Sequence, residues 1–564
     1  MYEKFKNAEF DDLYFKNPSA AFRGAPFWAW NAQLDKNDLL WQIDRLAEMG
    51  FGGFFMHTRC GLEIEYLGKE FMSLIQACAA YAKQKGMFAF LYDEDRWPSG
   101  AAGGFVTENK AFRQKSLYLT QKPPAEVAAW GKREERDPKF LFCFDIAFSG
   151  DGRLKHFRKI AENEAAKREK WYVYFLLAPK QPWYNGFTYP DTMNENAVKT
   201  FIDITHEAYK RAVGSEFGKT VPAIFTDEPN YGWIMGAQYE RNIPDVMLPW
   251  TDDFAETFQK AFGYDILPLL PRIVWVTENG DPATPCYHYF RHLTERFAAA
   301  YSDQIGSWCK KNGIAFTGHL LNEPMLESQS RNTGEAMRHY LNFDIPGIDI
   351  LCNRVELSSA KQAQSVAHQC EKEGVLCEMY GVTGWDFDFC GHKFQGDWLA
   401  ALGVTLRVPH LSWVSMKGSA KRDYPASISF QSAWYGEYPY IENHFARVNT
   451  ALTRGKPLVK IAVIHPIESY WLAAGDLAHT EKERQRMEEQ FDALIQWLLR
   501  GCLDFDFVSE SLLPVLYKPS KKGFTVEKGI YRRQNDLRRR SDPAGLYVAR
   551  LHDRRAGKIS RSRR

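Results

Sequence analysis

The run Pro222–Pro229, PAIFTDEP, constrains the fold of this chain more than any other stretch. Three small or apolar residues lead directly to Thr226, Asp227 and Glu228, and a proline follows at once. The pattern predicts a strand buried on both faces that delivers two carboxylates at its C-terminal end. In parallel α/β folds, chemistry collects at those ends. Glu228 is therefore a catalytic candidate, although the pair taken alone could equally cap the next helix.

The same pattern recurs along the chain. Seven other apolar runs end in polar or aromatic side chains, and helical periodicity separates most of them: 26–31, 51–57, 87–95, 314–324, 347–353, 374–381 and 404–413. Eight strand–helix units predict an α/β fold of the closed (β/α)8, TIM-barrel type over residues 1–452.

Three segments depart from this rhythm. Residues 117–190 contain short alternating pieces among charges and predict a β-rich insertion after the third strand. Residues 453–528 resemble the start of a second α/β domain that is incomplete. The arginine-rich end, 529–564, has no hydrophobic period and predicts a disordered basic tail. Out-of-frame translation or a disrupted gene end is the favoured interpretation of this tail, and a basic arm for nucleic acid is the alternative.

Charge and cysteine usage narrow the class of protein. Residues 531–564 hold 12 Lys and Arg against 3 Asp and Glu, which leaves 60 basic and 67 acidic residues elsewhere. This acidic balance argues against a nucleic-acid partner. The ten cysteines form no CxxC pair, as is typical of reduced thiols, and no apolar stretch reaches the roughly 18 residues of a membrane span. We therefore expect a cytoplasmic protein without a membrane partner.

The predicted strand ends bring together carboxylates, histidines and aromatic rings. Cleavage of a glycosidic bond needs two carboxyl groups, one to protonate the leaving oxygen and one to attack or to activate water. Glu228 on the fourth strand and Glu378 on the seventh could face each other across the barrel. The substrate-binding candidates at the same ends are Trp30, His57, Asp93, Asp95, Trp97, Asp227, His319, Asn322, Trp385, Asp386, His410 and Trp413.

Other interpretations remain open at this stage. Glu378 lies in an apolar run, so its side chain either reaches the barrel mouth or is buried in an ion pair. Glu323 could be a third active carboxylate, a metal ligand or a turn residue. A metal-dependent hydrolase could use His57 and His319, but the sequence has no HExxH motif. The interrupted second domain also leaves room for a non-catalytic carbohydrate-binding remnant.

Several motifs carry a family resemblance. The segments PFWAWN, MGFGGFFMHTRCGL, YDEDRWPSGAAGG, FTDEP, GHLLNEP and SMKGSAKRDYPASISFQ resemble the catalytic barrel of the α-L-rhamnosidases of glycoside hydrolase family 106, over about residues 20–515. The resemblance implies an inverting cleavage of terminal α-linked L-rhamnose, with Glu228 as the acid and Glu378 as the base. It also implies a calcium ion that contacts sugar hydroxyls, with Glu323 as a calcium or sugar ligand, and no organic cofactor. Family members usually continue into further modules, so we expect this chain to be a truncated form.

Overall fold

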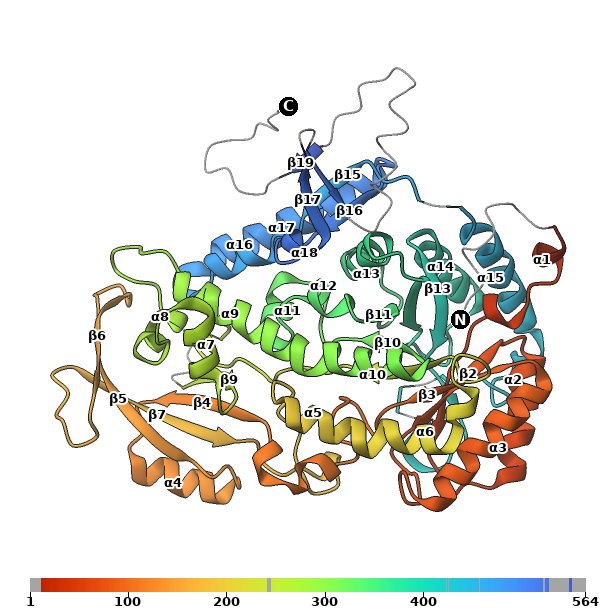
Figure 1. The fold of residues 1–564 in the computed structure, drawn as a ribbon, viewed down its shortest axis with the longest axis horizontal. Helices are drawn as coiled ribbons and strands as arrows, with labels where there is room; N and C mark the ends of the chain where they lie inside the picture. The colour runs from red at the N-terminus through yellow and green to blue at the C-terminus, as the bar shows by residue number, and fades with distance from the viewer. Residues whose placement is uncertain are drawn as a thin grey trace.

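The chain forms a parallel barrel, whose strands lie to the right of the middle in Figure 1. The computed structural model describes residues 12–240, 245–421, 423–424, 426–455, 457–520, 523–526 and 547–549. The barrel strands follow one another in chain order: β1 (Phe27–Trp30), β2 (Gly53–Thr58), β3 (Phe88–Tyr92), β8 (Ala223–Asp227), β10 (Ala315–His319), β11 (Ile345–Ile350), β12 (Val375–Met379), β13 (Val404–Pro409) and β14 (Ser412–Trp413).

The last two strands are successive parts of one predicted strand, and they complete the barrel. β14 pairs with β1 in parallel, with Trp28 opposite Ser412 and Ala29 opposite Trp413. All eight predicted runs coincide with barrel strands, so the predicted TIM-type barrel is confirmed.

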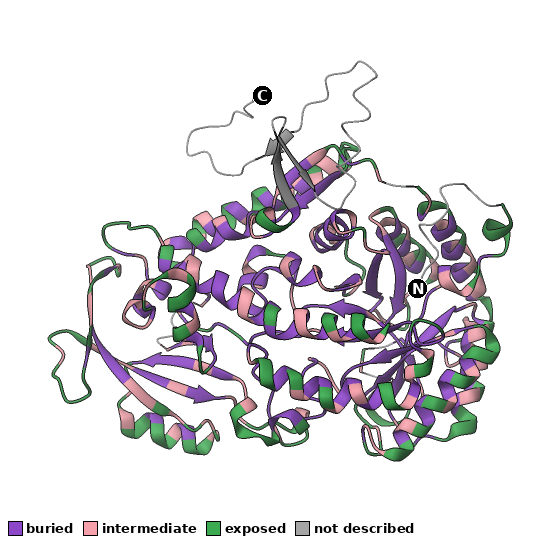
Figure 2. Cartoon of the chain, viewed as in Figure 1, coloured by how far each residue is buried: buried purple, intermediate pink, exposed green. Residues whose placement is uncertain are grey.

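The strands are buried on both faces, as Figure 2 shows. In β1, Phe27 and Ala29 belong to the hydrophobic cluster inside the barrel, whereas Trp28 and Trp30 belong to the larger cluster under the helices. Because side chains alternate along a strand, burial on both sides produces the continuous apolar runs of the sequence. The same alternation decides which residues at each strand end can reach the barrel mouth.

Helices cover the outside of the barrel: α2 (Lys36–Glu48), α3 (Lys69–Lys85), α5 (Glu195–Phe201), α6 (Glu207–Val213), α9 (Thr284–Phe297), α10 (Gln304–Asn312), α13 (Leu357–Gln369), α14 (Phe389–Ala401) and α15 (Pro439–Leu452). Their ends carry capping residues. The Asp35 side chain accepts hydrogen bonds from Asn37 N and Asp38 N at the start of α2. Gly86 closes α3 in the left-handed region, at φ +67°.

A five-stranded antiparallel sheet lies beside the barrel. Its order is β6-β5-β7-β4-β9. Its strands are β4 (Lys115–Thr120), β5 (Lys139–Phe148), β6 (Leu154–Ile160), β7 (Glu169–Leu177) and β9 (Val246–Trp250), and α4 (Pro124–Arg133) packs on one face. β9 follows β8 in the chain, so the sheet draws on more than the expected segment 117–190. The chain after β8 therefore adds a strand, β9, to this sheet.

A second parallel sheet follows the barrel. β15 (Ile461–Ile464) lies between β16 (Phe505–Val508) and β19 (Tyr547–Ala549). α16 (Ile467–Leu472) and the long α17 (Leu477–Arg500) connect β15 to β16 and lie across the barrel helices (Figure 1). The remaining elements are short: α1 (Asp12–Lys16), α7 (Phe254–Phe262), α8 (Leu270–Val274), α11 (Leu326–Asn332), α12 (Ala336–Tyr340), α18 (Leu513–Leu516), β17 (Tyr517–Ser520) and β18 (Gly523–Val526).

The sequence predicts a basic tail at the C-terminal end and no membrane-spanning segment. Apart from β19, the expected basic tail at 529–564 lies outside the described residues. Among the described helices, none combines the length and apolar character needed to cross a membrane.

Gly318 is expected to be essential for the contact between β8 and β10. It has φ +123°, and a Cβ atom built on it would lie 1.9 Å from the Thr226 carbonyl oxygen. We expect Gly318→Ala to lower the free energy of unfolding by about 3 kcal/mol or more, because the two strands must separate. Gly86→Ala is the control. It is also left-handed but faces open space, so it should cost only about 1 kcal/mol. Denaturant titration of both variants measures the difference, and equal losses would contradict this account.

Candidate active site

The C-terminal end of the barrel carries a layer of polar side chains above the apolar interior. In several strands, a residue of the interior cluster is followed two positions later by a polar one. His57 follows Phe55, Asp227 follows Phe225, Glu378 follows Leu376 and His410 follows Val408. Since the side-chain period of a strand is two, these polar groups continue the inward face to the mouth.

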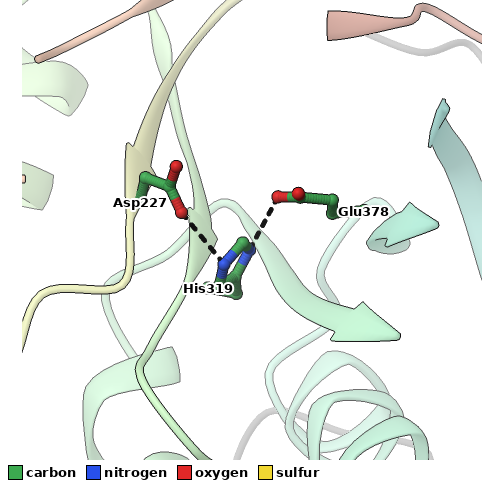
Figure 3. A group of neighbouring side chains, drawn as sticks. All are labelled: Asp227, His319 and Glu378. Atoms are coloured by element: carbon green, nitrogen blue, oxygen red, sulfur yellow. Dashed lines mark ion pairs between the residues drawn. The ribbon is translucent and has the colours of Figure 1, made fainter. Parts of the chain in front are cut away.

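His319 lies between two carboxylates from neighbouring parts of the barrel (Figure 3). Its Nε2 is 3.1 Å from Asp227 Oδ1, and its Nδ1 is 3.8 Å from Glu378 Oε2. Burial opposes the charged imidazole, but the hydrogen bond and charge of Asp227, with the charges of Glu378 and Asp349, raise the pKa of His319 well above its usual value. His319 therefore holds a positive charge at the centre of the acidic groups at neutral pH.

Glu228 lies next to this centre in a left-handed backbone conformation, at φ +49°. Such conformations are uncommon for residues other than glycine and cluster at functional sites. Ligand atoms of Glu228, His319 and Asp349 all lie within 4.8 Å of one another. Burial, followed by the charge of Asp227, raises the pKa of Glu228 to about 8. A carboxyl group with this pKa is protonated at neutral pH, which is what a general acid requires.

Glu378 points into the polar layer, where each of its carboxylate oxygens lies 3.8 Å from an imidazole nitrogen. Its Oε1 is 3.8 Å from His410 Nε2, and its buried Oε2 has no hydrogen-bond partner. Burial, followed by the charges of Asp349 and Asp227, raises the pKa of Glu378 well above its usual value. Asp349 lies opposite Glu378 in the β11–β12 register, and burial raises the pKa of Asp349 to about 7.

Arg59 organises the other side of the mouth. Its guanidinium pairs with Asp423 at 3.0 Å and lies 4.4 Å from the Trp97 ring centroid and 5.4 Å from that of Trp413. Its Nη1 is 3.4 Å from His57 Nε2 and 3.5 Å from His410 Nε2. Burial and this guanidinium hold the pKa of both histidines well below the usual value. Both rings are therefore neutral, with Nε2 facing an N–H donor.

Three of the expected substrate ligands make contacts within the protein that give them a structural role. Trp30 faces the helix layer and packs against Phe71, with ring centroids 5.4 Å apart, so it cannot stack on a sugar. Asp93 accepts a hydrogen bond from Ser99 Oγ at 2.6 Å. Asp95 accepts from Arg96 Nε and Asn185 Nδ2, both at 3.0 Å. These carboxylates hold the loops after β3 in place.

Glu94 explains the glycine-rich motif after β3. Its carboxylate accepts hydrogen bonds from five backbone N–H groups: those of Asp95, Gly100, Ala101, Ala102 and Gly103. Five donors around one buried carboxylate fix the loop that follows β3.

The candidates after β10 and β12 either have hydrogen-bond partners of their own or are exposed. Asn322 Nδ2 donates to Asn332 Oδ1 at 3.0 Å. Glu323 Oε1 accepts from Leu320 N at 2.9 Å and from the Tyr340 hydroxyl at 3.3 Å. Trp385 and Asp386 are exposed on the loop after β12.

The sequence did not single out Asp349, Arg59 or Tyr92. Tyr92 Oη donates to Asp227 Oδ2 at 2.6 Å and so fixes the carboxylate that pairs with His319. Asp349 lies inside a predicted strand, and Arg59 lies two positions after His57. Strand phase could have found all three, since each continues an inward face.

The described residues contain two groups that could hold a metal ion: Asp227, His319 and Glu378, and Glu228, His319 and Asp349. Neither group contains Glu323 or His57. The oxygen donors suit a hard cation such as calcium. Asp349 Oδ1 is also buried without a hydrogen-bond partner.

Together, a parallel α/β barrel and converging carboxyl groups at its C-terminal end are typical of TIM-barrel glycoside hydrolases. A family model described as alpha-L-rhamnosidase, for glycoside hydrolase family 106, matches residues 179–465, just over half of the chain. The chain belongs to this family, so the resemblance seen in the sequence motifs is confirmed.

A solved rhamnosidase structure shows the same fold. The rhamnosidase from Novosphingobium sp. PP1Y has a TM-score of 0.61 and 13% identity, and the match covers 92% of this chain and 66% of that one. This chain therefore spans slightly less than two thirds of that protein. A beta-galactosidase from the Antarctic haloarchaeon Halorubrum lacusprofundi has a TM-score of 0.48 and 12% identity, covering 86% of this chain and 66% of the other. No curated protein matches the sequence.

The raised pKa of Glu228 predicts a pH-dependent loss of stability. Between the usual value of 4.5 and about 8, the folded state keeps a proton that the unfolded state has released. The contribution of Glu228 to the free energy of unfolding is therefore at its maximum at low pH, and it is lost as pH rises through about 8. Melting temperatures of wild type and Glu228→Gln, measured from pH 4 to 9, should show the wild type losing stability relative to the variant. The exposed control Glu126→Gln should follow the wild type, and a parallel course for Glu228→Gln would contradict the assignment.

Proposed function

We propose that this protein is a glycoside hydrolase that removes terminal α-L-rhamnose from oligosaccharides or small glycosides with inversion. The observation that carries the proposal is the pair of glutamates, Glu228 and Glu378, that share His319 as a charged neighbour at the barrel mouth. The family match supports the choice of sugar.

In this mechanism, Glu228 donates a proton to the glycosidic oxygen as the bond to the anomeric carbon breaks. Its pKa of about 8 keeps that proton available at neutral pH. Glu378 takes a proton from the water that attacks the opposite face of the sugar. A buried group of carboxyls cannot all be ionised, so at least one proton stays in the cluster. We assign it to Glu228, the acid that the family resemblance implies. The charge of His319 lowers the pKa of both glutamates and so does not distinguish between them.

His319 and its partners position this machinery. The hydrogen bond from Tyr92 to Asp227 and the ion pair between Asp227 and His319 hold the imidazole between the two carboxylates. Arg59, through Asp423 and the two neutral histidines, fixes the wall beside Glu378. Trp97 flanks the same guanidinium. We therefore keep Trp97, His57 and His410 as residues that line the sugar site.

Replacing either glutamate tests the assignment. Glu228→Gln and Glu378→Gln should each lower kcat on 4-nitrophenyl α-L-rhamnoside by roughly 10²–10⁴-fold, because general acid–base transfer is lost. Thermal unfolding of both variants should stay cooperative. The exposed control Glu126→Gln should retain full activity. Wild-type rates in either glutamate variant would refute the two-carboxylate mechanism.

The two roles can be separated by the leaving group. With a 2,4-dinitrophenyl glycoside, the leaving oxygen needs little protonation. Glu228→Gln should therefore recover most of its activity on this substrate, whereas Glu378→Gln should not. Proton NMR of the first product should show the β-anomer of rhamnose. Release of the α-anomer would indicate retention and a nucleophilic role for Glu378.

Calcium is part of the proposal. Asp349, with its unpartnered buried oxygen, is the residue of the candidate metal groups that would hold the ion, and the family resemblance adds Glu323. The ion would supply positive charge for sugar hydroxyl groups. Calcium at a hundredfold excess over its Kd should stabilise the fold by about 2.7 kcal/mol. Thermal melts with calcium or magnesium chloride should show a rise with calcium that Asp349→Asn removes. An equal rise in that variant would place the ion elsewhere.

The proposal also includes a cytoplasmic location. All ten cysteines are free thiols, which supports a reducing compartment.

A further inference from the structure

A surface pocket lies on the rim of the barrel beside the candidate active site. It has a volume of about 560 Å³, and its lining includes Asn353, Thr383, Asp386, Phe387 and Phe394. Asn353 belongs to the loop after β11, and the other residues belong to the loop after β12 and the first turns of α14. The strands that lead into this pocket are therefore those that carry Asp349 and Glu378.

Short contacts connect the pocket walls to the catalytic cluster. Cys352 N–H donates to the Gly381 carbonyl oxygen at 2.7 Å, and Gln395 Nε2 donates to the Cys352 carbonyl oxygen at 3.0 Å. A Cβ atom at Gly381 would lie 3.3 Å from the Leu351 side chain and 3.6 Å from the His410 ring. His410 in turn faces Glu378 at 3.8 Å. The loop that walls the pocket thus touches a residue of the polar layer.

The same two loops hold unusual backbone conformations. Cys352, Tyr380 and Val382 are left-handed, at φ +61°, +73° and +60°. A β-branched residue such as Val382 is rare in this region, and such strain concentrates at ligand sites. The Tyr380 hydroxyl donates to the His392 carbonyl oxygen at 3.0 Å and so ties the strained loop to α14.

The composition of the pocket indicates what it binds. The Phe394 side chain is 53% exposed. Trp385, which lies between two pocket-lining residues in the sequence, is 45% exposed. The Asp386 carboxylate, the Asn353 amide and the Thr383 hydroxyl lie in the same short segments. Aromatic faces next to hydrogen-bonding groups suit a sugar ring, which has an apolar face and polar edges. A purely apolar ligand would leave these polar groups without partners.

We propose that this pocket is a subsite for the sugar unit next to the terminal rhamnose, so that the protein prefers rhamnosyl oligosaccharides to rhamnosides with small leaving groups. This inference rests on the proposed function. Phe394 supplies the stacking surface and Asn353 a hydrogen bond. The terminal sugar is held by the polar layer, and the remainder of the substrate extends over the rim at β11 and β12.

A ratio of two activities tests the subsite. The substrates are an α-L-rhamnosyl-glucose disaccharide and 4-nitrophenyl α-L-rhamnoside. In Phe394→Ala, the ratio of kcat/KM for the disaccharide to that for the nitrophenyl glycoside should fall about tenfold, chiefly through KM. Phe394→Trp keeps an aromatic face and should restore the ratio. Trp497→Ala, which removes an aromatic ring that is 73% exposed on α17, is the matched control and should leave the ratio at the wild-type value.

A binding measurement separates this inference from the proposed function. Calorimetry on Glu378→Gln should give about tenfold tighter binding of the disaccharide than of free rhamnose, and adding Phe394→Ala should remove that advantage. A wild-type ratio in Phe394→Ala, or equal affinities for the two ligands, would overturn the subsite. A protein that hydrolyses neither substrate but keeps a Phe394-dependent advantage in binding would overturn the proposed reaction and leave the subsite standing.

Discussion

The charge of one histidine balances the acidic end of the barrel. The buried Asp227 and Glu378 and the half-buried Glu228 and Asp349 are brought together in one layer, where ionised carboxylates repel one another and lose hydration. His319 lies among them with one nitrogen on Asp227 and the other towards Glu378. The imidazolium lets part of the cluster ionise while another part keeps its proton. The proposed mechanism depends on that division between an acid and a base.

The rest of the structure holds this balance in place. Tyr92 fixes Asp227 from below, and the five N–H donors around Glu94 fix the loop after β3. The segment after the barrel takes part as well. Arg484 of α17 donates to the Gln238 carbonyl oxygen in the chain after β8, and Glu488 accepts from Leu326 N and Glu327 N at the start of α11. The loops that follow the strands of Glu228 and His319 are therefore fastened from outside the barrel.

Much of the fold could be predicted from the sequence, because burial on both faces turns each barrel strand into a short apolar run that ends in a polar residue. Glu228, Asp227, His319 and Glu378 were found in this way. Strand phase explains where three further residues lie. Trp30 and Asp93 are at strand ends but on the outward phase, whereas Asp349 is inside a strand on the inward phase. A polar residue at the end of an apolar run marks the strand end, whereas the side that its side chain faces depends on the strand's phase relative to the barrel interior.

The sequence by itself determined the number and order of the barrel strands and the chemical groups at their ends, since local hydrophobic patterns fix strands and the residue type fixes the side chain. Only the tertiary structure decided which groups meet. Arg59 finds Asp423 across 364 positions, and His319 finds Asp227 and Glu378 on other strands. The raised pKa values arise from burial and from charges that closure of the barrel brings within a few ångströms, and no local pattern encodes those distances.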